Sequence, residues 1–252
     1  MGQRKSLIAA NWKMHKTIGE AVSFIRDIQA EVGDCVDREV VIAPPFTALG
    51  SARDALARKG YRLAAQNCHY ETKGAFTGEV SVGMLRDAGC ELVIVGHSER
   101  RHIFGETDDV IRKKVFSVFG EGLTPILCLG EVLEERESGK TFDVVSRQLE
   151  NAVQGLPVEA AARLVVAYEP VWAIGTGKTA TPEQAQEVHA FLRERYASLF
   201  EKAIANQVRV LYGGSVKPDN VDALMAKADI DGLLVGGASL EVGSFKRIIQ
   251  YQ

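Results

Sequence analysis

The sequence predicts an α/β protein that folds as a single (β/α)8 barrel over residues 1–252. Eight short apolar runs alternate with helical stretches from one end of the chain to the other, which gives βα units of roughly 30 residues each. The runs are apolar throughout, as is typical of parallel strands that are buried on both faces. No proline-rich linker or change of composition divides the chain, and 46% of its residues are hydrophobic, so one large core is available.

The strands are expected where these apolar runs lie. Their ranges, in chain order, are 7–10, 40–43, 61–65, 92–95, 125–129, 164–168, 208–212 and 232–235. The best-defined helix is expected after Thr181, because Thr181, Pro182 and Gln184 supply an N-cap, a first-turn proline and a capping-box partner. Apolar residues at helical spacing are expected to form one face of that helix: Ala185, Val188, Leu192, Leu199 and Ala203.

An open doubly wound sheet is the alternative fold. Such a sheet usually places a glycine-rich dinucleotide-binding turn after its first strand. Here the first strand runs into Asn11-Trp12-Lys13 instead, which favours the barrel.

Charge and hydropathy argue against several classes of partner. The formal net charge is −3, which disfavours a nucleic-acid or membrane surface as the main partner. No apolar run approaches the roughly 20 residues that span a bilayer, and the first residues lack the apolar core of a signal peptide. Gly2 opens a loose myristoylation pattern, but that pattern is short and often accidental. We therefore expect a cytoplasmic protein.

Cysteine and histidine spacing does not predict a metal site. With no secretory signal, reduced thiols are expected at the four cysteines, Cys35, Cys68, Cys90 and Cys128. Cys128 ends a strand without an activating partner in the sequence, so packing is favoured over nucleophilic chemistry. Four histidines lack partners at ligand spacing and are interpreted as surface or structural residues: His15, His69, His102 and His189.

Barrel enzymes carry their catalytic residues at the carboxyl ends of the strands, so the residues after each run are the candidates. Glu169 directly follows the sixth run, and Pro170 stops the strand because proline has no N–H to donate. A loop with two glycines, Gly175 and Gly177, follows. A lone carboxylate beside a flexible lid is typical of a general base in a site closed to water. The alternative is a charged turn residue beside an ordinary connecting loop.

His97 and Lys13 are the candidate partners of this acid. His97 comes just before Ser98-Glu99-Arg100-Arg101, a predicted first helical turn whose N–H groups can donate to the imidazole and favour its neutral form. A neutral ring can donate its other N–H to a substrate oxygen, whereas a structural histidine would only cap the helix. Lys13 can stabilise negative charge on an oxygen, face solvent or form an imine. Glu99 can pair with Lys13 or serve as a helix-start acid, and Asn11 can orient these groups.

Paired glycines follow the seventh and eighth runs, in Gly213-Gly214-Ser215 and Gly236-Gly237. Barrels often bind phosphate at these two loops. Glycine lets backbone N–H groups approach an anion without a Cβ in the way, and Gly175 can add another N–H. The sequence therefore predicts a phosphate site, with simple tight turns as the alternative.

Residues 66–81 form a long connection after the third run, with Phe76 near its centre. Loops of this length in compact domains tend to be functional or mobile, and an exposed phenylalanine at a loop tip indicates a partner surface. A homodimer contact is the favoured interpretation, and a disordered flap is the alternative.

These segments together resemble the signature of the triosephosphate isomerase family over essentially the whole chain. The matching segments are Ala10-Asn-Trp-Lys-Met14, Gly96-His-Ser-Glu-Arg-Arg101, Tyr168-Glu-Pro-Val-Trp-Ala-Ile-Gly-Thr-Gly-Lys178, Tyr212-Gly-Gly-Ser215 and Gly236-Gly237. The resemblance implies a TIM barrel that interconverts dihydroxyacetone phosphate and D-glyceraldehyde 3-phosphate through an enediolate, in glycolysis and gluconeogenesis. His15 is one departure, because many relatives carry a different polar residue there.

The resemblance also implies catalytic roles. Glu169 would be the base, neutral His97 the electrophile and Lys13 the electrostatic clamp. Asn11 would bond a substrate oxygen, and Glu99 would support the site.

Binding roles are implied in the same way. The phosphate would meet backbone N–H groups at Gly175, Ser215, Gly236 and Gly237, and Tyr212 and Ser215 would latch a closed lid. Family members are commonly homodimers and need no metal or organic cofactor; the contacts expected here are Thr77, Phe76 and Met14. Two rival functions stay open: an aldolase that uses Lys13 as an imine former, and a catalytically idle barrel that only binds.

Overall fold

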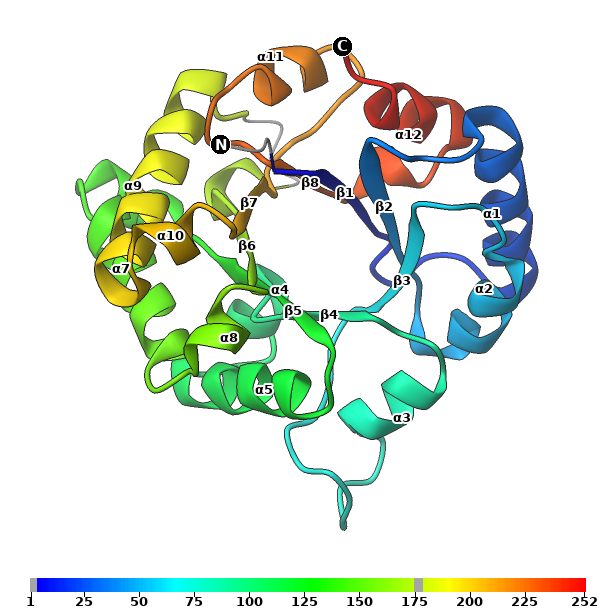
Figure 1. Ribbon diagram of the computed structural model, residues 1–252, viewed down its shortest axis with the longest axis horizontal. Coiled ribbons are helices and arrows are strands. Elements are labelled where there is room, and N and C mark those ends of the chain that lie inside the picture. The colour runs from blue at the N-terminus through cyan, green and yellow to red at the C-terminus, as the bar shows by residue number, and fades with distance from the viewer. Residues whose placement is uncertain (1–3, 175–178) are drawn as a thin grey trace.

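The computed structural model describes residues 4–174 and 179–252. Within this range eight parallel strands close into one barrel in sequence order, with β8 pairing with β1 (Figure 1). The strands are β1 (Ser6–Asn11), β2 (Arg38–Ala43), β3 (Tyr61–Ala65), β4 (Leu92–Val95), β5 (Thr124–Leu129), β6 (Val165–Tyr168), β7 (Arg209–Tyr212) and β8 (Gly232–Val235). The predicted (β/α)8 barrel is therefore confirmed. Three strands coincide with their predicted ranges, and the other five differ by one or two residues at an end.

Helices surround the barrel and connect successive strands (Figure 1). They are α1 (Ile18–Val32), α2 (Leu49–Ala55), α3 (Val82–Asp87), α4 (Ser98–His102), α5 (Asp108–Gly120), α6 (Leu133–Glu137), α7 (Thr141–Val153), α8 (Val158–Ala161), α9 (Pro182–Phe200), α10 (Lys202–Ala205), α11 (Val221–Met225) and α12 (Val242–Ile249). Three short 3-10 helices lie in the loops: η1 (Phe46–Ala48), η2 (Val171–Ala173) and η3 (Gly237–Ser239).

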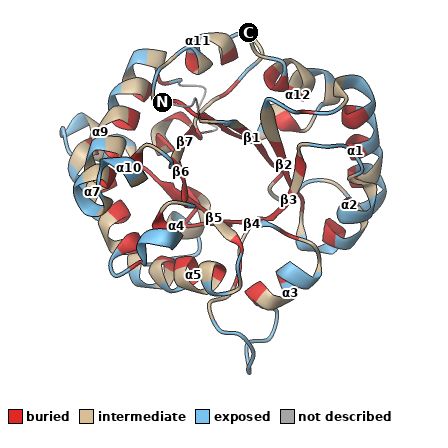
Figure 2. Ribbon diagram, in the orientation of Figure 1, coloured by how far each residue is buried: buried red, intermediate tan, exposed pale blue. Residues whose placement is uncertain are grey.

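Each strand contributes to two cores, because successive side chains in a strand point to opposite faces. One set of buried residues fills the barrel interior: Leu7, Ala9, Val41, Ala43, Ala64, Leu92, Ile94, Ile126, Cys128, Val165, Ala167, Leu211 and Leu234. Their neighbours, such as Ile8, Val93 and Val166, pack between the sheet and the helices. Burial on both faces explains why the strands are apolar without alternation (Figure 2).

The helix predicted after Thr181 is α9, and its capping box is present. The Thr181 N–H donates to Gln184 Oε1 at 3.0 Å, and the Gln184 N–H donates to Thr181 Oγ1 at 3.2 Å. Ala185, Val188 and Leu192 are buried as predicted.

The predicted apolar face is wrong at its far end. Leu199 is 39% exposed, and Ala203 lies exposed in α10, beyond the end of α9. Glu201 adopts a φ of +72°, which takes the chain off the helical path, so helical spacing no longer applies to Ala203. Tyr196 supplies the buried side chain in the last turns of α9 instead.

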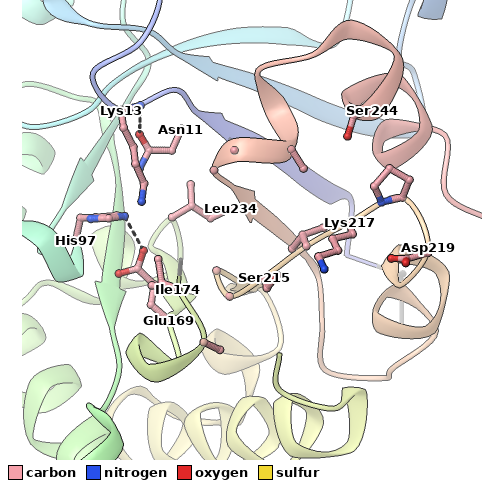
Figure 3. Close-up of a pocket in the computed structure, with 18 residues that line it drawn as sticks. Asn11, Lys13, His97, Glu169, Ile174, Ser215, Lys217, Asp219, Leu234 and Ser244 are labelled. Carbon is pink, nitrogen blue, oxygen red and sulfur yellow. Dashed lines mark hydrogen bonds and ion pairs between the residues drawn. The ribbon is translucent and has the colours of Figure 1, made fainter. Parts of the chain in front are cut away.

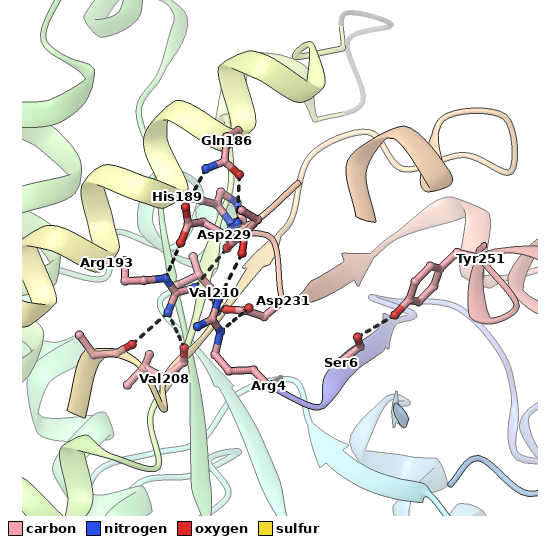
Figure 4. Close-up of polar contacts among 12 residues, drawn as sticks. Arg4, Ser6, Gln186, His189, Arg193, Val208, Val210, Asp229, Asp231 and Tyr251 are labelled. Atoms are coloured by element: carbon pink, nitrogen blue, oxygen red, sulfur yellow. Dashed lines mark hydrogen bonds and ion pairs between the residues drawn. The ribbon is translucent and has the colours of Figure 1, made fainter. Parts of the chain in front are cut away.

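Ion pairs join α9 to the amino-terminal end of the barrel (Figure 4). Arg193 donates to Asp229 and Asp231, each at 2.6 Å, and Arg4 donates to Asp231 at 2.5 Å. Asp231 also accepts the Val210 N–H at 2.8 Å, which joins β7 to the segment before β8. These contacts stabilise the amino-terminal end of the barrel. The candidate site lies at the other end, where the strands finish.

Residues 66–81 leave the barrel between β3 and α3 and project away from it (Figure 1). Residues 71–79 are exposed, and the base of the loop is closed by the His69 N–H, which donates to the Val80 carbonyl at 2.8 Å.

Candidate active site

A cavity of about 620 Å³ opens at the carboxyl ends of the strands (Figure 3). Its lining includes Asn11 at the end of β1, Lys13 just beyond it, His97 after β4 and Glu169 after β6. The turns after β7 and β8 complete it with Ser215, Gly236 and Gly237. The barrel therefore brings together, at one rim, candidate residues from five strands that are far apart in the sequence.

Glu169 is 1% exposed and lies directly beside His97. Its Oε1 is 3.1 Å from His97 Nε2, and its Oε2 accepts the Ser98 N–H at 3.0 Å. The carboxylate is thus held by the Ser98 N–H against the His97 ring at the start of α4, and it faces the cavity that the turns after β7 and β8 also line (Figure 3).

Two glycines make room for Glu169. A Cβ at Gly213 would lie 2.8 Å from Glu169 Cγ, and a Cβ at Gly130 would lie 1.7 Å from the Glu169 carbonyl oxygen. Both distances are shorter than nonbonded contacts allow, so the side chain of Glu169 depends on glycine at position 213 and its backbone depends on glycine at position 130.

The hydrogen bonds of His97 assign its tautomer. His97 precedes α4 as its N-cap, and its Nδ1 accepts the Glu99 N–H at 3.2 Å. An accepting nitrogen carries no proton, so the proton of the neutral ring is on Nε2, which lies 3.1 Å from Glu169 Oε1. The expected donation from the helix start to the imidazole is therefore present.

Lys13 is held from three sides. Its Nζ donates to Glu99 Oε1 at 2.7 Å, its backbone N–H donates to Asn11 Oδ1 at 3.2 Å, and its carbonyl accepts from Gln66 Nε2 at 2.9 Å. Partial burial opposes ionisation of Glu99, but the hydrogen bond and the positive charge of Lys13 outweigh it and lower the pKa of that carboxyl. The backbone of Lys13 has a φ of +52°, which is uncommon for a residue with a side chain.

Tyr212, a predicted latch residue, ends β7 with its hydroxyl beside Gly214, where a Cβ would lie 2.3 Å from that oxygen. Burial raises the pKa of Tyr212 to about 12, and the backbone of Ala180 opposes the shift. Gly175 and Gly177 lie outside the described residues, as does Gly2.

Glu131 is a buried charged residue beside the site for which the sequence suggested no role. It is fully buried after β5, and its Oε1 accepts from the Tyr168 hydroxyl at 3.1 Å and from Trp172 Nε1 at 2.9 Å. Arg136 completes the contact at 3.2 Å. These bonds tie η2, the start of the predicted lid, to the end of β6. The only signal in the sequence is an acidic residue two positions after a strand.

The remaining cysteine and histidine candidates lie apart from this chemistry. Burial raises the pKa of the Cys128 thiol well above its ordinary value, so the group is a protonated packing residue. His189 is fully buried beneath Tyr168 and Tyr212. Across residues 4–174 and 179–252, no three His, Cys, Asp or Glu side chains gather where they could hold a metal ion. No helix in the same ranges is long and apolar enough to cross a membrane.

The residues predicted for a dimer contact are exposed. Met14 is 94% exposed, Phe76 is 42% exposed, and Thr77 is exposed beside it. A smaller cavity of about 220 Å³ lies next to the first one and shares Asn11, Lys13 and His97 with it. Its outer lining includes three exposed apolar side chains, Met14, Phe46 and Phe104.

Comparison with known proteins gives a consistent result. A family model described as triosephosphate isomerase matches residues 6–252. The triosephosphate isomerase of Syntrophotalea carbinolica is 53% identical over 249 residues, which cover 99% of each chain. Those of Citrifermentans bemidjiense and Endomicrobium trichonymphae are 54% and 52% identical over 248 residues, which cover 98% of this chain and 99% of theirs.

Proposed function

Because this chain belongs to the triosephosphate isomerase family, we propose that Glu169, His97 and Lys13 carry out its reaction at the rim of the barrel. The reaction is the interconversion of dihydroxyacetone phosphate and D-glyceraldehyde 3-phosphate, an isomerisation of glycolysis. The observation that supports these roles best is the 3.1 Å contact between Glu169 and His97 in a cavity that Lys13 and two glycine turns also line.

Glu169 is proposed to move the proton. In the free enzyme its carboxylate lies 3.1 Å from His97 Nε2 and accepts the Ser98 N–H. A substrate whose oxygen takes over the His97 Nε2–H separates the carboxylate from the ring and leaves it facing the reacting carbons. Glu169 then takes a proton from the carbon beside the carbonyl and returns it to the adjacent carbon, while the hydroxyl proton passes from one oxygen to the other, so that carbonyl and hydroxyl exchange places.

His97 and Lys13 are proposed to stabilise the enediolate that forms between these two steps. His97 donates its Nε2–H to the developing oxygen anion, and its Nδ1 is kept unprotonated by the Glu99 N–H. Lys13 supplies the positive charge, with Glu99 fixing the position of its ammonium group. Asn11 holds the Lys13 backbone and is placed to bond a substrate oxygen. Every step moves only protons between named groups, so the proposal includes no metal or organic cofactor.

The phosphate is proposed to bind at Ser215, Gly236 and Gly237, with Gly175 adding an N–H from the lid. Support comes from the position of the first three around the cavity and from the ability of glycine backbone to approach an anion. Tyr212 and Ser215 are proposed to latch the closed lid, which would exclude water from an enediolate that can otherwise lose phosphate.

A homodimer is also proposed, with the loop over residues 66–81 inserted beside the active site of a second copy. The loop projects as an exposed arm with Phe76 and Thr77 near its tip. The smaller cavity next to Lys13 has an exposed apolar rim that includes Met14, and an apolar loop tip would cover it. We further propose that residues 1–252 act as one domain in the cytoplasm, in keeping with four cysteines that are free and buried.

The direct test is a coupled assay with D-glyceraldehyde 3-phosphate, in which dihydroxyacetone phosphate is reduced with consumption of NADH. The unaltered protein should turn over, and Glu169→Gln should lose about 10²–10⁴ in rate because it lacks the base. Glu159→Gln, on the exposed surface of α8, is the matched control. Equal rates in all three proteins would refute the role of Glu169. Trapping of a borohydride adduct with a ketose phosphate would instead favour imine chemistry at Lys13.

A further inference from the structure

Lys16 connects the loop after β1 to the loop after β8, outside the active-site cavity. Its Nζ donates to the Leu240 carbonyl at 2.9 Å. The same ammonium group lies 4.6 Å from the centre of the Phe24 ring and 5.4 Å from the centre of the Trp12 ring. A cation held over two aromatic rings and bonded to a carbonyl is not a freely moving surface lysine.

The segment that Lys16 contacts continues directly from the proposed phosphate turn. Gly236 precedes η3, and Gly237 is its first residue. The Ser239 N–H donates to the Gly236 carbonyl at 2.8 Å, and the Leu240 N–H donates to the Gly237 carbonyl at 3.1 Å. Ser239 Oγ adds a bond to the Gly236 carbonyl at 2.7 Å. A shift of Leu240 is therefore passed to the two glycines that line the cavity.

The other end of the connection is the loop that carries Lys13. Trp12 Nε1 donates to the Ser239 carbonyl at 3.2 Å, one residue before the carbonyl that Lys16 contacts. Lys13 itself lies against the turn, since a Cβ at Gly236 would be 3.7 Å from Lys13 Cε. Trp12 and Lys16 thus flank Lys13 in sequence and join its loop to η3 at two successive carbonyls.

The backbone conformation of Lys16 indicates that this position requires the lysine side chain. Its φ is +75°, in the region that glycine adopts freely and residues with a Cβ rarely do. Such a conformation persists where the surrounding contacts determine it. Here the contacts of the ammonium group with Leu240 and the two rings do so.

We infer that Lys16 is a positioning residue for phosphate recognition, fixing the separation between the ammonium group of Lys13 and the turn at Gly236 and Gly237. Lys16 is not among the described residues that line the cavity, so it acts on the substrate only through these two loops. The inference rests on the proposed phosphate site, and it adds a residue whose removal weakens binding of the anion more than it slows proton transfer.

The test measures competitive inhibition by inorganic phosphate, together with KM and kcat, in three variants at Lys16. Lys16→Met keeps the length and apolar stem but removes the charge and the donor. It should raise both the inhibition constant and KM by about tenfold, roughly the effect of one lost charged hydrogen bond, and change kcat less. Lys16→Arg can still donate to Leu240 and lie over the rings, so it should restore most of the affinity.

Lys16→Gly separates the backbone from the side chain. It relieves the left-handed conformation and should unfold at a higher temperature than Lys16→Met, yet bind phosphate as weakly. Lys246→Met is the control, because Lys246 lies on α12 and pairs at 3.1 Å with Glu31 of α1, away from the cavity. It should match the unaltered enzyme.

Two results would overturn the inference: a folded Lys16→Met enzyme with an unchanged inhibition constant, or an arginine variant that binds phosphate no better than the methionine variant. A merely structural role would lower the unfolding temperature and leave phosphate inhibition unchanged in folded enzyme. Failure of the proposed function itself is distinguishable, because the unaltered protein would then neither isomerise the triose phosphate nor be inhibited by phosphate.

Discussion

Shortening the proposed base by one methylene group tests the geometry of the site without removing its charge. In Glu169→Asp the carboxylate retracts toward the backbone by about 1 Å, while β6 and the neighbouring glycines are unchanged. In the unaltered protein the Glu169 oxygens lie 3.1 Å from His97 Nε2 and 3.0 Å from the Ser98 N. In the aspartate variant both distances become too long for direct contacts of normal length.

The expected loss can be worked from this displacement. A misplacement of about 1 Å in a reacting group costs about 10²-fold in rate, or about 2.7 kcal/mol in the activation free energy. Complete removal of a general base costs about 10²–10⁴, so the aspartate variant should lie between the unaltered enzyme and Glu169→Gln. KM should change little, because the proposed phosphate contacts at Ser215, Gly236 and Gly237 do not involve this side chain.

The coupled assay with D-glyceraldehyde 3-phosphate gives kcat and KM for each protein, and circular dichroism checks that each is folded. With chemistry slowed, a primary isotope effect on kcat should appear for substrate deuterated at the carbon that loses the proton. Glu159→Asp, at an exposed position of α8, should retain full activity. Near-normal kcat in folded Glu169→Asp would remove this carboxylate from the proton transfer.

Four further predictions concern the surroundings of the base, the imidazole, acid stability and assembly. Gly213→Ala places a Cβ 2.8 Å from the side chain of the base and should lower kcat by at least about tenfold, whereas Gly243→Ala, with open space at its Cβ, should not; equal rates would contradict the steric account. His97 should give nitrogen NMR signals with the ring proton on Nε2 and none on Nδ1, and a proton on Nδ1 would rule out the assigned tautomer. Burial lowers the pKa of His189 from 6.5 to about 4, so between these two pH values the unfolded chain binds a proton that the folded chain does not. The free energy of unfolding should therefore fall by about 3 kcal/mol as the pH drops from 6.5 to about 4. His189→Gln should lose that part of the pH dependence of the unfolding temperature. Thr77→Arg places a charge in the proposed dimer contact and should raise the dissociation constant at least about 10²-fold in sedimentation experiments, and an unchanged mass at all concentrations would reject that contact.

The fold was predictable because its signal is local. Each strand is a short, mostly apolar run that is buried on both faces, and for β3, β4 and β8 the apolar run has the same bounds as the strand. The start of α9 was equally local, since its capping box uses residues three positions apart. The end of α9 was not, because Glu201 leaves the helical region while the apolar spacing carries on toward Ala203.

The candidate site was predictable in its membership and not in its contacts. Glu169, His97 and Lys13 could be picked out because each follows an apolar run, and a barrel brings all run ends to one rim. The bonds that orient them come from elsewhere in the chain. Gln66 holds the carbonyl of Lys13, and the Ser98 N–H holds Glu169, and neither contact leaves a pattern in sequence spacing.

Glu131 and Lys16 show what kind of residue a sequence hides. Neither lines the larger cavity among the described residues, and each looks like an ordinary charged residue in a loop. Glu131 becomes informative only when Tyr168 and Trp172 are seen to donate to it inside the protein. Lys16 becomes informative only when its φ, its two rings and the Leu240 carbonyl are considered together. The strand ends converge to form the candidate active site. The relative positions of its residues therefore depend on charged residues just outside the cavity that hold neighbouring loops together.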